Sequence, residues 1–218
     1  MTPATILSAS GDPPPRAALD PAAEVLAAGG VVVVPTDTVY GLAVLAERGG
    51  AAQLFALKRR PSEVAVPVLV ADVDQALALG HEELPHVARQ LMQRWWPGGL
   101  TVVVRRRSGL GLDLGGPDSE TIGLRLPAHP VPVALAARLG PLAVTSANLH
   151  GRPPAETAGE ALEQLGAEVG LVLDGGPCTG SASTVVSCLG DGVRLLRPGT
   201  VPFADVVAVA SGTEGLRR

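Results

Sequence analysis

The hydrophobic and polar positions along this chain change their period several times, and each period predicts a different element. Residues 31–34 are four consecutive valines, a run too apolar to alternate, which indicates a strand buried on both faces. Residues 121–126 alternate with a period of two, which predicts a strand that places Thr121 and Arg125 on one face. Residues 82–96 carry large apolar side chains at helical spacing, which is typical of an amphipathic helix.

Further strands and helices are delimited by the glycines and prolines that interrupt the apolar runs. Strands are also predicted at 67–71, 100–104, 142–147, 171–174, 183–186 and 192–196, with the last two side by side. Helices are also predicted at 51–57, 73–79 and 130–139, and another begins with Asp20 as its N-cap and Pro21 at its first position. This alternation predicts an α/β fold. We expect residues 1–19 to be an irregular N-terminal arm and residues 20–218 to form a single domain, because no long linker divides them.

Cations and small hydrogen-bonding side chains recur where the predicted strands and helices end, and strand ends are where ligands bind in α/β sheets. These candidates are Thr36, Lys58, Arg60, Thr121, Arg125, Ser146, Asn148, Ser183 and Arg197. They include no close pair of carboxylates and no catalytic triad. Such a site suits anion binding and phosphoryl or nucleotidyl transfer, in which positioning and charge neutralisation supply most of the catalysis.

Lys58 is the only lysine in a chain that otherwise uses arginine for its basic side chains. A compact ammonium group differs from a planar guanidinium group, so this position indicates a site that requires a mobile point charge. Lys58 also follows the helix predicted at 51–57, and cations are favoured at helix C-termini. Its position is compatible with both interpretations, the helix cap and the phosphate ligand.

The composition supports a large apolar core and excludes several classes of protein. Charged residues make up 17% of the chain, against about 25% in average domains, and hydrophobic residues make up 46%. The net charge of −4 gives no overall attraction for nucleic acid. Cys178 and Cys188 are too few for a disulfide framework, and the four histidines lack the spacing of metal ligands, so we expect no protein metal site. No apolar run approaches the roughly 20 residues that span a bilayer, so the chain is expected to be cytoplasmic and independent of membranes.

Seven motifs occur in the order found in threonylcarbamoyl-AMP synthases, YrdC-like proteins that serve tRNA modification, and the sequence resembles this family over about residues 20–200. The motifs are GGVVVVPTDTVYGLA from residue 29, the turn Lys58-x-Arg60-Pro61, WPGGLT from 96, TIGLRLP from 121, SAN from 146, STV from 183 and LRPG from 196. The resemblance implies a YrdC-like α/β domain with a twisted mixed sheet flanked by helices and one large basic cleft. It also implies the short form, without the additional C-terminal domain of longer relatives.

The resemblance further implies a reaction and a set of roles. Such enzymes combine L-threonine, bicarbonate and ATP into threonylcarbamoyl-AMP and pyrophosphate, and partner proteins then transfer the threonylcarbamoyl group to tRNA. Threonine would be held by Thr36, Arg125, Ser146 and Ser183. ATP would be held by Lys58, Arg60, Thr121, Asn148 and Arg197, with Lys58 and Arg60 as catalytic residues. Mg²⁺ would be bound mainly by the phosphates.

Some positions depart from the family pattern and leave other functions open. Val66 and Ala71 stand where some members have the Asn and His of an N-P-L-x-x-H pattern, His150 replaces a serine, and Gly99 replaces a frequent proline. One alternative is a paralogue that binds nucleotide and RNA without synthase activity, and another is a carbamoyl-adenylate enzyme with a different acceptor. We expect any RNA binding through residues 105–107 to be weak and lost at moderate salt, because few aromatic side chains are available for stacking.

Overall fold

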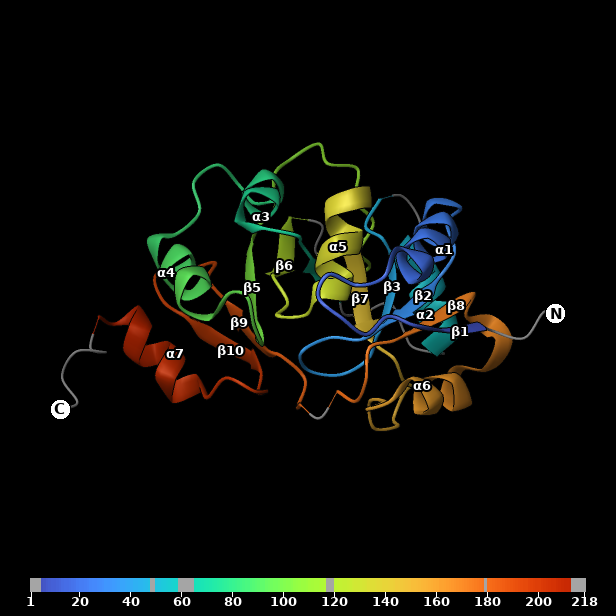
Figure 1. Ribbon diagram of the computed structural model, residues 1–218. Coiled ribbons are helices and arrows are strands. Elements are labelled where there is room, and N and C mark those ends of the chain that lie inside the picture. Colours follow the sequence, from blue (N-terminus) through green and yellow to red (C-terminus); the bar gives the residue numbers. More distant parts are fainter. Residues whose placement is uncertain (1–4, 48–49, 59–64, 117–119, 179, 213–218) are drawn as a thin grey trace.

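A single mixed sheet organises the protein (Figure 1). The computed structural model describes residues 5–47, 50–58, 65–116, 120–178 and 180–212. Within these residues the ten strands are ordered β1-β8-β2-β3-β7-β4-β6-β5-β9-β10. The strands are β1 (Thr5–Ser8), β2 (Val32–Val34), β3 (Gly41–Leu45), β4 (Val68–Leu69), β5 (Leu100–Arg105), β6 (Thr121–Arg125), β7 (Leu142–Ser146), β8 (Leu171–Asp174), β9 (Thr184–Ser187) and β10 (Arg194–Arg197).

Helices cover both faces of this sheet and divide the core into two clusters. They are α1 (Arg16–Ala27), α2 (Gly50–Lys58), α3 (Val73–Leu79), α4 (His86–Trp95), α5 (Pro130–Leu139), α6 (Ala158–Leu165) and α7 (Phe203–Ala210), with a short 3-10 helix, η1, at Gly166–Glu168. One cluster contains side chains of α1 and α5, which lie on the same side of the sheet in Figure 1. The other contains side chains of α2, α3, α4, α6 and α7. β1 and α7 lie at opposite ends of the molecule.

The structure confirms that the valine run at 31–34 is buried on both faces of the sheet. Val31 and Val33 belong to one core cluster, Val32 and Val34 belong to the other, and none is more than 5% exposed. β2 pairs in parallel with β8 and antiparallel with β3, so it is an internal strand of a mixed sheet. Pro35 follows directly, where the loss of an N–H donor does not interrupt the ladder.

Two predictions for the first thirty residues are wrong. Residues 5–8 are not irregular, because they form β1, which pairs in parallel with β8 along its whole length. The first helix begins at Arg16, so Asp20 lies inside α1 and not at its N-cap. The Asp20 carboxylate instead accepts a hydrogen bond from Arg138 on α5. α1 packs against α5, and Ala18, which precedes the boundary that the Asp-Pro signal indicated, is buried in the same core cluster.

The remaining predicted elements are present with small shifts at their ends. The helix predicted at 73–79 is α3, with Asp72 as its N-cap accepting from the Gln75 backbone N–H. The helix predicted at 82–96 begins only at His86, because Pro85 precedes it in an extended conformation. The strands predicted side by side at 183–186 and 192–196 are β9 and β10, which pair antiparallel.

Candidate functional site

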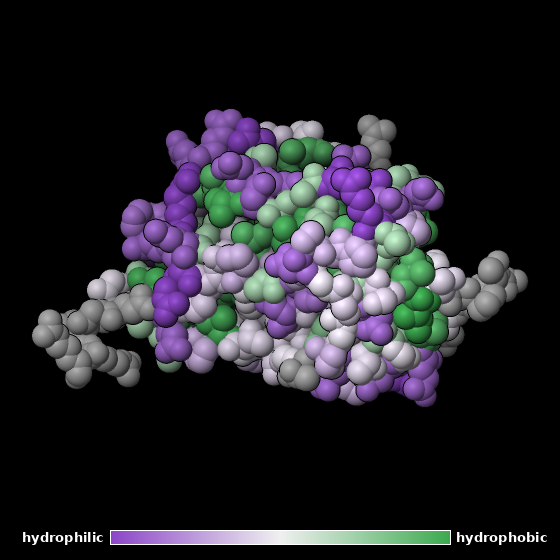
Figure 2. All heavy atoms as spheres, in the orientation of Figure 1, coloured by the Kyte–Doolittle hydropathy of each residue, from purple (hydrophilic) through white to green (hydrophobic). Residues whose placement is uncertain are grey.

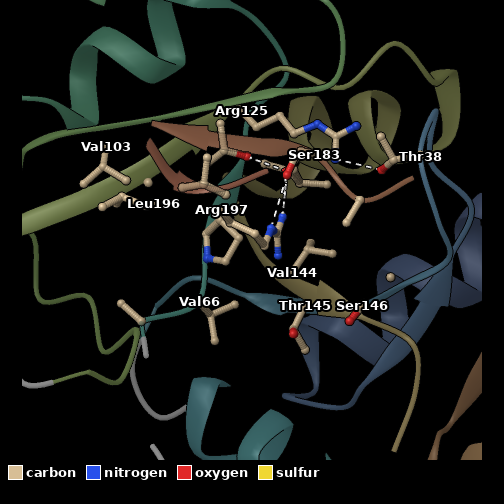
Figure 3. Close-up of a pocket in the computed structure, with 18 of the residues that line it drawn as sticks. Thr38, Val66, Val103, Arg125, Val144, Thr145, Ser146, Ser183, Leu196 and Arg197 are labelled. Atoms are coloured by element: carbon tan, nitrogen blue, oxygen red, sulfur yellow. Dashed lines mark hydrogen bonds between the residues drawn. The ribbon is translucent and has the colours of Figure 1, made fainter. Parts of the chain in front are cut away.

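A cavity of about 590 Å³ opens over the strands on the β10 side of the sheet, between residues that are distant in sequence (Figure 3). Six of the predicted site residues line it, namely Thr36, Thr121, Arg125, Ser146, Ser183 and Arg197. Its lining includes three arginines, Arg125, Arg194 and Arg197, and no carboxylate among the described residues. Figure 3 shows Val103 and Leu196 on one side of the cavity and Thr38, Arg125 and Ser183 on the other. The cavity therefore has an apolar wall and a polar wall.

Lys58 is tied to the end of β7 at the polar wall. Its Nζ donates to Asn148 Oδ1 at 2.8 Å, to Ser146 Oγ at 3.2 Å and to the Ser146 carbonyl oxygen. The Ser146 hydroxyl in turn donates to Asn148 Oδ1 at 2.6 Å. Lys58 is the last residue of α2 but is only 3% exposed, so its ammonium group does not face water as an ordinary helix cap would. The structure thus brings together Lys58, Ser146 and Asn148, while Arg60 lies outside the described residues.

Arg125 forms a buried ion pair with an acid that the sequence interpretation did not select. Its Nη2 lies 2.7 Å from Asp37 Oδ1, and the two side chains are 7% and 16% exposed. Its Nε donates to the Gly98 carbonyl oxygen at 3.0 Å and its Nη1 to Thr38 Oγ1 at 3.0 Å. Burial lowers the pKa of the Arg125 guanidinium, and the neighbouring Asp37 opposes that change. A buried arginine is costly unless it meets an anion, and Asp37 supplies that anion here.

The hydroxyl of Thr36 is fully engaged by its own loop. It donates to the Val39 carbonyl oxygen at 2.6 Å and accepts from the backbone N–H groups of Thr38 and Val39 at 3.1 and 3.2 Å. Thr38 Oγ1 also lies 3.0 Å from Thr36 Oγ1. A series of polar contacts therefore links Arg125 through Thr38 to Thr36. This network stabilises the loop that begins the polar wall.

Ser183 lies between Thr101 of β5 and Arg197 of β10. Its hydroxyl oxygen is 2.9 Å from Thr101 Oγ1 and 3.0 Å from Arg197 Nη2, which also donates to the Ser183 carbonyl oxygen at 2.9 Å. Gly199 makes this geometry possible, because a Cβ atom there would lie 2.1 Å from the Ala182 carbonyl oxygen. The loop after β10 therefore packs directly on the backbone that carries Ser183.

The residues that depart from the family pattern lie in different parts of the structure. Val66 lines the cavity, so this substitution lies within the candidate site. Ala71 does not line the cavity and packs against the cluster that contains side chains of α1 and α5. The Gly99 carbonyl oxygen accepts a hydrogen bond from Thr200 Oγ1 at 3.2 Å. A Cβ atom at position 99 would lie 2.1 Å from Thr200 Oγ1, so a larger residue there would clash with Thr200.

Sequence reasoning missed Asp37, Thr38 and Thr101 as parts of the site. Asp37 and Thr38 stand in the polar segment after β2, so their position beside Thr36 was a usable signal. Thr101 carried no such signal, because a threonine in a strand is ordinarily explained by its β-propensity. Only the pairing of β5 with β9 brings it beside Ser183.

The arginines at 105–107 are partly neutralised by acids from neighbouring segments. Arg105 lies 4.0 Å from Glu120, and Arg107 lies 3.5 Å from Glu82. Hydrophilic side chains gather over the end of the molecule where α3 and α4 lie (Figure 2). These exposed pairs mix both signs of charge, so the segment is not a uniformly basic stripe.

The described residues form neither a cluster of metal ligands nor a helix that could span a membrane. Within the ranges that the structure describes, no three His, Cys, Asp or Glu side chains are grouped so that they could hold a metal ion. No helix in the same ranges is long and apolar enough to cross a membrane. Cys178 and Cys188 are both free thiols and both buried.

Comparisons with known proteins place this geometry in a family. A family model named for Sua5, YciO and YrdC, and described as telomere recombination, matches residues 24–199. A Mycobacterium tuberculosis H37Rv protein assigned by name as a threonylcarbamoyl-AMP synthase is 41% identical over 184 residues, covering 84% of each chain. The threonylcarbamoyl-AMP synthase of Bacillus subtilis is 37% identical over 191 residues, which is 86% of this chain and 55% of that protein.

A solved structure gives the same result at the level of the fold. The crystal structure of Pyrococcus abyssi Sua5 complexed with L-threonine superimposes with a TM-score of 0.86 at 29% identity, over 94% of this chain. This chain spans 60% of that protein, so it matches a part of the longer relative. The matched residues include every motif and all the site residues described above, and the chain belongs to the Sua5/YciO/YrdC family.

Proposed function

We propose that this protein is an L-threonylcarbamoyladenylate synthase, which makes threonylcarbamoyl-AMP and pyrophosphate from L-threonine, bicarbonate and ATP. The observation that carries the proposal is the convergence of predicted residues on one cavity. Ser183 and Arg197 form one group in its lining, and Ser146 in the lining is hydrogen-bonded to Lys58 and Asn148, which do not themselves line the cavity. The names of the relatives and the threonine complex of P. abyssi Sua5 support the same activity.

The reaction requires two steps that the polar wall is suited to support. The threonine amine first adds to the carbon of bicarbonate with loss of water, which gives a carbamate. A carbamate oxygen then attacks the α-phosphorus of ATP, and the bond from that phosphorus to the pyrophosphate oxygen breaks. Binding both substrates in one cavity removes the entropic cost of bringing them together. Cations beside the phosphates stabilise the charge that develops on the departing pyrophosphate.

We assign the threonine site to Arg125, Ser146 and Ser183, with Thr36 acting through the loop that its hydroxyl holds. We assign the ATP site to Lys58, Arg60, Thr121, Asn148 and Arg197, with Lys58 and Arg60 as the catalytic residues. Arg125 retains N–H groups beyond the three that bond to Gly98, Thr38 and Asp37, since a guanidinium carries five donors. It is therefore able to bind a carboxylate while Asp37 holds it in place.

A divalent cation fits this site only as part of the nucleotide. Asp37 and Asp174 adjoin the described cavity lining through Arg125 and Tyr40, and these partners already bond to Oδ1 of each carboxylate. The other polar groups are hydroxyls and cations, which do not make an oxygen cage for Mg²⁺. We propose that Mg²⁺ arrives bound to the triphosphate, where it would screen phosphate charge, because the described part of the chain holds no carboxylate cluster that could bind it.

The cellular setting is also a proposal. Two buried free thiols agree with a reducing compartment, and we propose that the protein acts in the cytoplasm. The product would be consumed by tRNA-modification proteins that transfer the threonylcarbamoyl group. Direct contact with RNA would be weak, because Arg105 and Arg107 already pair with glutamates.

Omission of single reactants tests the proposed function. Purified protein is incubated with ATP, Mg²⁺, bicarbonate and L-threonine, and pyrophosphate and the acyl-adenylate are both measured. We expect both products to require all of the reactants, and alanine in place of threonine to give little product. Equal pyrophosphate release without threonine would contradict the proposal and favour a different acceptor.

A further inference from the structure

The hydroxyl of Ser183 has a hydrogen-bond geometry that sets its direction. It lies on the cavity lining, is 4% exposed as a residue, and has two polar neighbours, Thr101 Oγ1 at 2.9 Å and Arg197 Nη2 at 3.0 Å. Figure 3 shows Ser183 and Arg197 directed toward each other across the polar wall. A hydroxyl has one hydrogen and two lone pairs, so the roles of these two neighbours decide where its hydrogen points.

Both neighbours are donors to Ser183. Arg197 is a cation without any acceptor, so it can only donate. Thr101 is 1% exposed, and Ser183 is its single side-chain hydrogen-bond partner among the described residues. If Thr101 accepted from Ser183, its own hydrogen would be buried without an acceptor, which is costly. The favourable arrangement therefore has Thr101 donating to Ser183 Oγ.

Two incoming donors leave the Ser183 hydrogen directed away from both of them, toward the cavity. The other hydroxyls assigned to threonine differ in this respect. The Thr36 hydrogen is committed to the Val39 carbonyl oxygen at 2.6 Å, and the Ser146 hydrogen is committed to Asn148 Oδ1 at 2.6 Å. Among these three hydroxyls, Ser183 is thus the one whose hydrogen is available to a ligand.

We propose that Thr101 is a positioning residue that makes the Ser183 hydroxyl a dedicated donor to the carboxylate of the amino acid substrate. This inference rests on the proposed function and specifies which end of threonine Ser183 contacts. A hydroxyl that donates its hydrogen is complementary to an anionic oxygen. It is not complementary to the amino group, whose N–H groups themselves need an acceptor. The charge of Arg197 polarises the Ser183 O–H bond and strengthens its hydrogen bond to an anion.

Isothermal titration of two ligands tests the proposal without relying on turnover. L-Threonine and L-threoninamide, which lacks the anionic carboxylate, are titrated into the wild-type protein and into Thr101→Val, Thr101→Ser and Thr184→Val. We expect Thr101→Val to weaken L-threonine binding about tenfold and L-threoninamide binding less than about twofold. Thr101→Ser keeps the hydroxyl and should restore binding of threonine to within about twofold of the wild type.

Thr184→Val is the matched control, because it also replaces a buried strand threonine. The Thr184 hydroxyl donates to the Val201 carbonyl oxygen at 2.7 Å and does not line the cavity. Its loss should lower the melting temperature without a selective effect on threonine. If Thr101→Val does not fold, Thr101→Ala provides the same test.

The possible outcomes separate the two proposals. A wild-type protein that binds neither ligand would overturn the proposed function together with this inference. A wild-type protein that binds threonine, with Thr101→Val equally tight, would overturn this inference alone. Equal weakening of both ligands by Thr101→Val would also overturn it, because that result indicates lost packing and not a lost hydrogen-bond direction.

Discussion

Replacement of Lys58 by methionine separates its contribution to folding from its contribution to the reaction. Methionine keeps much of the length of the side chain and removes the ammonium group. The Ser146 carbonyl oxygen would retain the Asn148 N–H at 3.0 Å, and Asn148 Oδ1 would retain the Ser146 hydroxyl at 2.6 Å. Of the three oxygens that accept from Lys58, Ser146 Oγ is the one that would be left without a donor, because Lys58 Nζ at 3.2 Å is lost. We therefore expect a loss of about 1–2 kcal/mol in the free energy of unfolding, below that for an abandoned buried charge.

The effect on the reaction should be much larger than this effect on stability. A loss of 1–2 kcal/mol lowers the melting temperature by about 2–8 °C in a chain of this size. Removing a cation that stabilises transition-state charge should lower kcat/KM about 100-fold or more. Lys58→Arg should also lose at least about tenfold, because a planar guanidinium cannot direct its donors to the same three oxygens. The assays are melting curves and steady-state pyrophosphate release on the same preparations.

A matched control removes a cation elsewhere. Arg138→Met breaks an exposed pair with Asp20 between α1 and α5 and should leave kcat/KM unchanged. Full activity in Lys58→Met, with only a lower melting temperature, would refute the reasoning and leave Lys58 as a structural tie between α2 and β7. Full activity in Lys58→Arg would show that any cation suffices.

Three further perturbations have expected outcomes. Asp37→Asn should cost about 3–5 kcal/mol in urea unfolding because it leaves the Arg125 charge buried without its partner, and Arg125→Met in the same chain should recover part of that loss. Burial raises the pKa of Cys188 from about 9 to about 11, so this thiol contributes fully to stability below pH 9. The free energy of unfolding should therefore fall by about 2–3 kcal/mol between pH 9 and 11. The fall over the same pH range should be smaller in Cys188→Ala, which lacks this thiol. Burial also raises the pKa of Cys178, so thiol reagents should label neither cysteine at pH 7 until the chain unfolds.

Local sequence signals were sufficient for most helices and for the internal strands except β3, which was not predicted, and they failed where partners are remote. The run at 31–34 could be assigned because a strand buried on both faces needs no alternation. β1 is a short edge strand whose ordering depends on β8, so its own four residues carried no pattern. α6 was missed although its signal was present. Thr157 and Glu160 form the ends of a capping motif, with Thr157 Oγ1 accepting from the Glu160 N–H at 3.1 Å.

The residues of the candidate site likewise fall into those that local sequence signals identified and those that they missed. The recurrence of small polar groups at strand ends was enough to select Ser146 and Ser183, and both line the cavity although β4, β6 and β5 lie between β7 and β9 in the sheet. The identity of the anion beside Arg125 could not be predicted, since Asp37 is 88 residues away in sequence. The direction of the Ser183 hydrogen depends on Thr101 and on β10, so it follows only from the assembled sheet.

The order of the strands also decides when, during synthesis, the cavity comes into existence. Its walls join Gly41 to Ser146 through β3 and β7, and Thr101 to Val185 through β5 and β9. Translation delivers the N-terminal half first, so Lys58 must wait for Asn148 and Ser183 must wait for Arg197. A nascent chain interrupted before β10 would therefore lack Leu196 from the apolar wall and Arg197 from the polar wall. Under the proposed site assignments, a chain that ends before β10 lacks Arg197 and should not compete for substrate with chains that have been translated through β10.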